Sequence, residues 1–190
     1  MSSSLPAADV FAALARACAE LGAGWYIFGA QAVVLYGRPR LTADLDVTIE
    51  ADPSRLGEVV AALAAAGLEP RADDLDQLVA RTRVLPLHHR ESGLPVDVVL
   101  AGPGLEAEFL ANARIVDVSG VAVPFIAPED LLVTKILAGR AKDIEDARGV
   151  LAERGDTLDL ARTRRFLGLL EAALGRSDLV RELERLIGKA

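Results

Sequence analysis

Segments with the pattern of β-strands occur only in the first 126 of the 190 residues, and this asymmetry restricts the folds that the chain can adopt. β-branched and aromatic residues, which favour strands, form short runs at 25–28, 40–50, 81–90, 94–100, 114–118 and 121–126. From Pro128 onwards the apolar residues recur only at helical spacing. We therefore expect an α/β (α+β) domain over residues 1–126, with a small mixed β-sheet flanked by helices, and a helical C-terminal region over 127–190.

Helix signals separate the strand-like runs. Segment 5–22 has helical spacing and stops at Gly22. Gly29 allows a tight turn from the first strand into a short helix that ends at Gly37. Asp52, followed by proline, is a good helix start, and segment 102–113 is a further helix candidate.

Two hairpins are expected among the later strands. The first pairs 81–90 with 94–100, and Pro86 places its first strand at the sheet edge in this prediction, because proline cannot donate a ladder hydrogen bond. The second pairs 114–118 with 121–126 through a turn at Ser119 and Gly120.

Composition indicates a cytoplasmic protein. Cys18 is the single cysteine, so no disulfide within the chain and no thiolate metal cluster can form. The N-terminus lacks a signal-peptide pattern, and the longest apolar run, 59–68, is too short for a membrane span. The formal charge of -7 opposes broad capture of a nucleic-acid backbone. Two alternatives stay open for the arginines around His88 and His89, a local basic groove or a solvated strand and loop; these are Arg81, Arg83 and Arg90.

Two carboxylates interrupt the strand-like segment RLTADLDVTIE at 40–50. Because side chains alternate along a strand, Asp44 and Asp46 share one face, with Cβ atoms about 6.5–7 Å apart, while Leu45 and Val47 point the other way. A divalent cation can bridge that gap through carboxylate oxygens. The alternative is an ordinary solvated strand face.

A third carboxylate, Asp97, lies inside the apolar strand segment PVDVVL. A charge there is costly unless it is paired or binds a metal. If the two strands are neighbours, Asp97 faces the same groove as Asp44 and Asp46, and a cation would relieve the repulsion among them. Carboxylates without cysteine or paired histidine suit Mg²⁺ or Mn²⁺, and two such ions can activate a hydroxyl and stabilise a leaving pyrophosphate. The chemistry expected is phosphoryl or nucleotidyl transfer.

Residues before the acidic strand suit a polyphosphate. The free N–H groups of the helix that follows Gly29 can face a triphosphate, although a lone glycine turn is also explained by backbone geometry alone. Arg38 and Arg40 can contact phosphate or form salt bridges with the acids.

Together, the segments FGAQAVVLYGRPRLTADLDVTI, PVDVV and PEDLLVTKILAGRAKDIEDA resemble the polymerase-β-type nucleotidyltransferase superfamily. The branch that they resemble most is that of the AbiEii/AbiGii abortive-infection toxins. The resemblance covers about residues 25–150 and implies a nucleotidyltransferase fold. The positions that match the family pattern are Gly29, Arg40, Thr42, Asp44, Asp46, Asp97, Lys135, Arg140, Asp143 and Asp146.

The resemblance also implies roles for these residues. Asp44, Asp46 and Asp97 would hold the metal and act in catalysis, Lys135 would contact the triphosphate, and Asp143 would be an active-site acid or orient Lys135. The expected nucleotide-binding set is Gly29, Ala30, Arg40, Thr42, Lys135 and Arg140. Other interpretations stay open: Lys135 can extend to the surface, and Asp146 is interpreted as a solvating or capping residue of its helix. Ala30 departs from the serine or second glycine of many members, so it offers no hydroxyl to a phosphate.

The function expected is Mg²⁺- or Mn²⁺-dependent transfer of a nucleoside monophosphate from NTP to an acceptor hydroxyl on a tRNA end, a protein or a small molecule. The chain would then be the toxin of a toxin–antitoxin pair or a small-molecule transferase. The alternative is an antitoxin or regulatory module that keeps the fold and binds nucleotide with little turnover. The acceptor is expected to dock on basic residues: Arg81, Arg83, Arg90, Arg162, Arg164 and Arg165.

Overall fold

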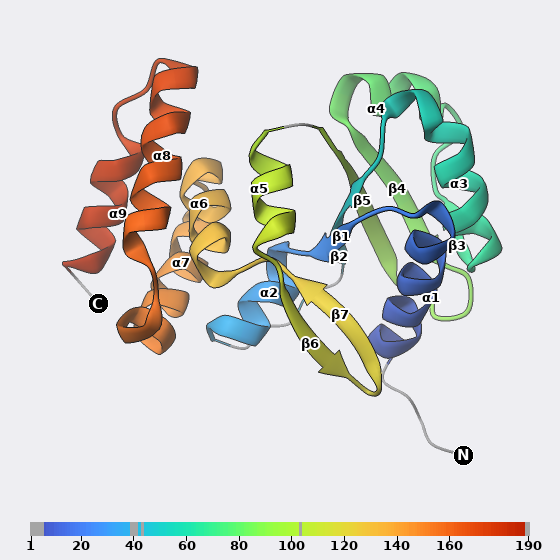
Figure 1. Ribbon diagram of the computed structural model, residues 1–190, viewed down its shortest axis with the longest axis horizontal. Coiled ribbons are helices and arrows are strands. Elements are labelled where there is room, and N and C mark those ends of the chain that lie inside the picture. The colour runs from blue at the N-terminus through green and yellow to red at the C-terminus, as the bar shows by residue number, and fades with distance from the viewer. Residues whose placement is uncertain (1–5, 39–41, 43, 103, 189–190) are drawn as a thin grey trace. The chain divides into compact units, whose positions relative to one another are not determined.

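The computed structural model describes residues 6–38, 42, 44–102 and 104–188. The chain divides into two compact units (Figure 1). The sheet unit comprises Met1–Ala30 and Thr42–Ile126, and the helical unit comprises Gln31–Leu41 and Ala127–Ala190. The sequence pattern did not indicate that 31–41 groups with the later helices.

The sheet unit is built on one mixed sheet, which has seven strands within the described residues, in the order β3-β4-β5-β2-β1-β7-β6. Their bounds are β1 Trp25–Ile27, β2 Leu45–Glu50, β3 Leu68–Pro70, β4 Val84–His89, β5 Pro95–Ala101, β6 Arg114–Val118 and β7 Val121–Phe125. The pairs β2/β5 and β1/β7 are parallel, and the other neighbours are antiparallel. The mixed α/β fold expected from the sequence is confirmed.

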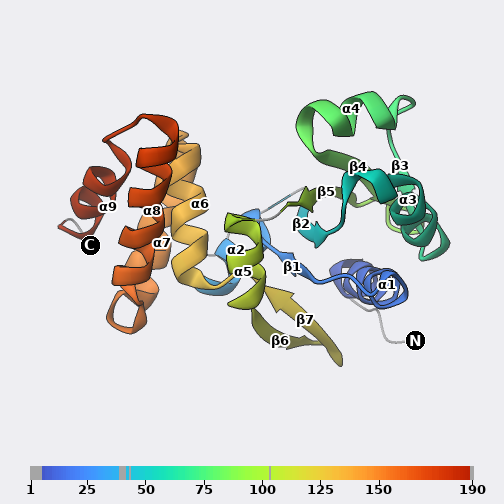
Figure 2. The same cartoon turned by 45° about the horizontal axis from the view of Figure 1, so that its top comes forward.

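Strand alternation separates a buried face from a polar one. Leu45, Val47 and Ile49 of β2 are fully buried, as are Val96 and Val98 of β5. The intervening residues, which include the aspartates, lie on the opposite face. The helices of this unit are α1 Pro6–Leu21, α3 Leu56–Ala65, which follows the 3-10 turn Pro53–Arg55, α4 Leu75–Thr82 and α5 Leu105–Ala111. Helices α1 and α3 pack against each other, as both views show (Figures 1 and 2).

The helical unit contains α6 Pro128–Ala138, α7 Ala141–Arg154, the 3-10 turn Gly155–Thr157, α8 Leu160–Leu174 and α9 Leu179–Ile187, together with most of α2 Gly29–Tyr36. Small residues allow α2 and α7 to approach closely: a Cβ on Gly37 would lie 3.1 Å from the Val150 backbone nitrogen. A two-pronged ion pair joins α6 to α8, in which Arg162 Nε and Nη2 lie 2.8 and 3.1 Å from the two carboxylate oxygens of the fully buried Asp130. Among the helices of the described residues, none has both the length and the apolar character of a membrane span.

One sequence expectation about the sheet is wrong. Pro86 does not lie on an edge strand, because β3 pairs with β4 on the side away from β5. The carbonyl of Pro86 accepts from the Arg71 N–H at 3.0 Å, just beyond the end of β3. The backbone N and C=O of one strand residue face the same neighbouring strand. The nitrogen of Pro86, which has no hydrogen, therefore also faces the end of β3. The hydrogen bonds between β4 and β5 are unaffected. Strand β3 and helix α4 were not predicted.

Candidate functional site

Two of the predicted acids are direct neighbours in the sheet. Parallel strands β2 and β5 pair Asp46 with Asp97 in register, so their side chains emerge on the same face of adjacent strands, about 4.8 Å apart. Both residues are half-buried. Like charges at directly opposed positions repel, so this pair needs a nearby positive charge. The pairing of β2 with β5 fulfils the condition stated from the sequence for these two acids to share one face.

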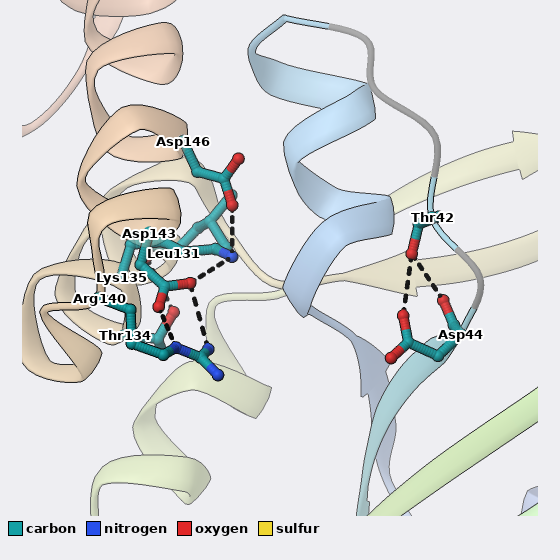
Figure 3. A network of polar contacts seen from close by, with 8 residues as sticks. All are labelled: Thr42, Asp44, Leu131, Thr134, Lys135, Arg140, Asp143 and Asp146. Atoms are coloured by element: carbon teal, nitrogen blue, oxygen red, sulfur yellow. Dashed lines mark hydrogen bonds and ion pairs between the residues drawn. The ribbon is translucent and has the colours of Figure 1, made fainter.

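The third predicted acid, Asp44, lies exposed immediately before β2. The Thr42 hydroxyl is 3.0 Å from both the backbone carbonyl and the Oδ1 of Asp44 (Figure 3). The contact holds the Thr42 hydroxyl against Asp44, so any effect of Thr42 on the site would act through Asp44. Arg40, the predicted phosphate contact in the same segment, lies outside the described residues.

Gly29 lies directly against Asp46. A Cβ on Gly29 would stand 1.9 Å from Asp46 Oδ2 and 2.7 Å from its Cγ, and the backbone of Gly29 has φ +61°, a conformation that favours glycine. The Phe28 N–H also donates to the Asp46 carbonyl at 3.0 Å. The turn and the start of α2 are therefore packed around one aspartate. Ala30, the next residue, is buried, so it contributes backbone only.

Asp97 is held by a residue that sequence reasoning missed. Arg71 Nη2 forms a short ion pair with Asp97 Oδ1, and Arg71 Nε donates to the Leu87 carbonyl at 2.8 Å. Arg71 directly follows β3, a three-residue strand that carries too little pattern to be found from the sequence. Within the described part of the chain, no three His, Cys, Asp or Glu side chains converge closely enough to form a metal cluster.

A second ionic cluster lies within the helical unit. Lys135 of α6 places its Nζ 2.8 Å from Asp146 Oδ2 and 3.2 Å from Asp143 Oδ1, both of α7 (Figure 3). Lys135, Asp143 and Asp146 are 6%, 0% and 7% exposed. Arg140 donates to both oxygens of Asp143 from the solvent side. The cluster joins α6 to α7 across the turn at Gly139, where φ is +64°.

The cluster bears on three predicted site residues. The Lys135 Nζ is already bonded to two carboxylates, and the Arg140 guanidinium is engaged with Asp143, so both cations are neutralised in this structure. The contact between Asp143 and Lys135 is of the kind expected of a residue that orients the lysine. The interpretation of Asp146 as a solvating or capping residue is wrong: it is buried and bonded to Lys135, because position 146 lies on the α7 face that packs against α6.

The pKa of Asp143 is shifted by this environment. Burial raises the pKa of the carboxyl, but the hydrogen bonds and positive charges of Arg140 and Lys135 outweigh it, so the pKa lies below its ordinary value of 3.8. A depressed pKa stabilises the fold at pH values above the ordinary pKa, and this contribution is lost as the pH falls through the depressed one.

We therefore expect Asp143→Asn to flatten the acid side of the stability profile. The free energy of unfolding, measured by urea denaturation at about pH 5 and about pH 3, should fall less steeply with acidification in the variant than in the wild type. Asp178→Asn is the control, because Asp178 belongs to an exposed ion pair with Arg176. The pKa of the Asp178 carboxyl is also lowered, mainly by the hydrogen bond from Arg176. An unchanged slope in Asp143→Asn would contradict the assignment.

The arginines expected to dock an acceptor mostly have partners in the protein. Arg83 donates to the Leu100 carbonyl from Nε at 2.8 Å, and Arg90 Nε is 2.7 Å from Glu69 Oε1. In the helical unit, Arg164 pairs with Glu184 at 2.6 Å, and Arg165 lies over the Phe166 ring at 4.4 Å. These contacts favour structural roles over a continuous basic groove.

Solved structures with similar folds are nucleotidyltransferases. The solution structure of the antibiotic-resistance factor ANT(2'')-Ia matches with a TM-score of 0.55 at 18% identity, over 89% of this chain and 97% of that one. A nucleotidyltransferase-like antigen from Paracoccidioides brasiliensis matches with a TM-score of 0.54 at 19% identity, over 92% and 90%. The lincosamide adenylyltransferase LnuA, with lincomycin bound, gives 0.51 at 14% identity, over 78% and 98%. These similarities show the fold.

Sequence comparison identifies the family. A search of curated proteins found no significant match. Residues 20–162 match the family described as nucleotidyltransferase of unknown function (DUF6036), and this range contains every predicted site residue. The chain belongs to this nucleotidyltransferase family.

Proposed function

We propose that this protein is a Mg²⁺- or Mn²⁺-dependent enzyme that transfers a nucleoside monophosphate from NTP to an acceptor hydroxyl. The observation that carries the proposal is the in-register pairing of Asp46 with Asp97, beside a glycine whose missing side chain leaves room for the Asp46 carboxylate. Membership of the nucleotidyltransferase family supports the reaction type. The metal, the acceptor and the place within the superfamily are our inferences.

The donor chemistry of the site fits a hard divalent cation. Asp46 and Asp97 offer carboxylate oxygens on adjacent strands, and Asp44 lies just before the first of them. Carboxylates are the protein ligands that Mg²⁺ and Mn²⁺ prefer, and a cation would offset the repulsion between the paired aspartates. We assign Asp44, Asp46 and Asp97 as the residues that would hold it. When bound, the cation would neutralise phosphate charge and lower the pKa of a coordinated hydroxyl.

The reaction assigned to the site is one in-line displacement. The acceptor oxygen forms a bond to the α-phosphorus, the bond from that phosphorus to the bridging oxygen breaks, and pyrophosphate leaves. We assign Asp97 to accept the hydroxyl proton. The N-terminus of α2 at Gly29 and Ala30 would approach the phosphates through backbone N–H groups, because Ala30 has no hydroxyl to offer.

Similar structures point to one class of acceptor. Two of them are an antibiotic-resistance factor and a lincosamide adenylyltransferase. A small molecule with a free hydroxyl is therefore the first acceptor to test. A tRNA end or a protein side chain is the acceptor expected if the chain is an AbiEii/AbiGii-like toxin with a cognate antitoxin.

A second candidate function is a nucleotide-binding module with little turnover, such as an antitoxin or a regulatory subunit. It is favoured by the neutralisation of Lys135, the expected triphosphate contact, within a buried ion cluster. Ala30 at the start of α2 also weakens the expected phosphate site. Such a protein would bind NTP without transferring nucleotide.

Transfer can be tested with α-labelled ATP, CTP, GTP and UTP. The purified protein is incubated with Mg²⁺ or Mn²⁺ and with total RNA, cell lysate, or a panel of aminoglycosides and lincosamides. We expect one nucleotide to label an acceptor, and EDTA to abolish the labelling. An Asp46→Asn protein prepared identically controls for contaminating transferases. Absence of label with every nucleotide, together with NTP binding that Asp46→Asn leaves unchanged, supports the binding module instead.

A further inference from the structure

Arg71 lies at the end of a row of residues that runs across the sheet to the paired aspartates. Its backbone N–H bonds to Pro86, Pro86 is the register partner of Asp97, and Asp97 is the register partner of Asp46. Register partners project from the same face of a sheet. The Arg71 side chain reaches from the end of β3 to Asp97 Oδ1 on β5, and β4 lies between these two strands.

Asp97 therefore lies between a negative charge on one side and a positive charge on the other. The Asp46 carboxylate lies on the β2 side, and the positively charged guanidinium of Arg71 lies on the β3 side. Attraction to Arg71 and repulsion by Asp46 act in the same direction, and both favour a position of the Asp97 carboxylate away from β2. This agrees with the finding that three acidic groups do not converge within the described residues, although the backbone register brings two of them side by side.

We propose that Arg71 is the internal counter-cation of Asp97 and sets the affinity of the site for divalent metal by competing with it. This inference rests on the proposed function and adds its regulation. The side chains of Arg71 and Asp97 are 38% and 32% exposed, so water screens their pair and a divalent ion can displace it. Without metal, the ion pair of Arg71 with Asp97 offsets the repulsion between Asp46 and Asp97. When metal and nucleotide bind, the cation replaces Arg71 as the partner of Asp97.

A purely structural role is the competing explanation. Arg71 Nε also bonds the Leu87 carbonyl, which fastens the segment after β3 to β4. Loss of that bond would change stability and leave the intrinsic metal affinity of the site unaltered. Binding of Mn²⁺ alone, without nucleotide, separates the two roles.

The experiment measures Mn²⁺ affinity of the full chain by electron paramagnetic resonance of the free ion. We expect Arg71→Gln to bind Mn²⁺ about two- to fivefold more tightly than the wild type, and Arg71→Lys to stay close to the wild type because it keeps the charge. Arg90→Gln is the matched control, since it removes the same charge from a pair with Glu69 of β3, the strand that Arg71 follows. It should change the affinity less than Arg71→Gln does.

The Asp97→Asn background completes the test. There, adding Arg71→Gln should give no gain, because the carboxylate for which the two cations compete is absent. Unchanged or weaker Mn²⁺ binding in Arg71→Gln overturns the inference, as does an equal gain in Arg90→Gln. If the wild type transfers nucleotide under either of those results, the proposed function stands and only the role of Arg71 falls. If neither the wild type nor Arg71→Gln binds Mn²⁺ or labels an acceptor, both proposals fail.

Discussion

Gly29→Ala is expected to lose at least about 100-fold in nucleotidyl transfer, although residue 29 contributes no side chain to the reaction. The added Cβ would stand 1.9 Å from Asp46 Oδ2, 2.7 Å from Cγ and 2.9 Å from the Asp46 Cβ, so no rotation of that side chain avoids all three contacts. Asp46 itself is anchored in β2 between β1 and β5. The carboxylate or the turn must move, and a displacement of about 1 Å at a catalytic group is enough for such a loss.

Gly22→Ala is the matched control for this substitution. Gly22 has φ +60°, nearly the value at Gly29, but a Cβ there would meet nothing within 4 Å. Both variants bear the same left-handed backbone strain, about 1–2 kcal/mol, and only Gly29→Ala disturbs an aspartate. Initial rates with saturating NTP and unfolding free energies are measured for both. Transfer by Gly29→Ala within tenfold of the Gly22→Ala rate would show that Asp46 is not a catalytic ligand.

The sequence carried enough information to locate the acids but not their surroundings. Period-two alternation in β2 put Asp46 opposite the buried Leu45 and Val47, and a charged residue inside an apolar strand marked Asp97. Their adjacency depended on a parallel pairing of β2 with β5, strands separated by the whole of α3, β3, α4 and β4. Whether two strands so far apart in the sequence pair depends on how the whole unit packs. Their adjacency could therefore be stated from the sequence only as a condition.

Arg71 shows why the rest could not be predicted. The strand before it, β3, is three residues long and ends in proline, so neither alternation nor propensity reveals it. Helix α4 begins after Asp73 and Asp74, and half of its residues are polar, so the segment resembles a loop. The segment between these elements looked unstructured, and Arg71, which pairs with Asp97, lies within it. The contact between Gly29 and Asp46 could not be predicted either. The glycine indicated a turn, but the sequence did not indicate which residue packs against that turn.

The helices of the helical unit could be predicted from the sequence because their signals are local. Helices α6 to α9 have local signals, such as proline and acidic residues in the first turn of α6 and glycine after its last. Lys135 among apolar neighbours indicated a special position, but the sequence did not distinguish a ligand contact from a buried pair. Its partners lie 8 and 11 residues further along, on the next helix. Only the packing of α7 against α6 decides that they meet.

Lys135→Met is expected to destabilise the helical unit by about 3–5 kcal/mol. The substitution keeps the length of the side chain and removes the charge, which leaves Asp146 buried without the Nζ that lies 2.8 Å from it. Asp143 lies 3.2 Å from the same Nζ and loses it as well. Adding Asp146→Asn should restore part of the loss, because the variant then buries one negative charge fewer beside the missing cation. Urea denaturation followed by circular dichroism measures all three proteins.

Lys142→Met is the control, because Lys142 is exposed in the first turn of α7 and its loss should change the unfolding free energy by less than about 0.5 kcal/mol. The same series separates the two roles of Lys135. If the lysine serves mainly the triphosphate, Lys135→Met will unfold like the wild type and bind NTP more weakly. If it serves mainly the junction of α6 and α7, stability will fall and Asp146→Asn will recover part of it. The exposures of 6%, 0% and 7% for Lys135, Asp143 and Asp146 favour the second result, because charges so deeply buried are strongly coupled to one another.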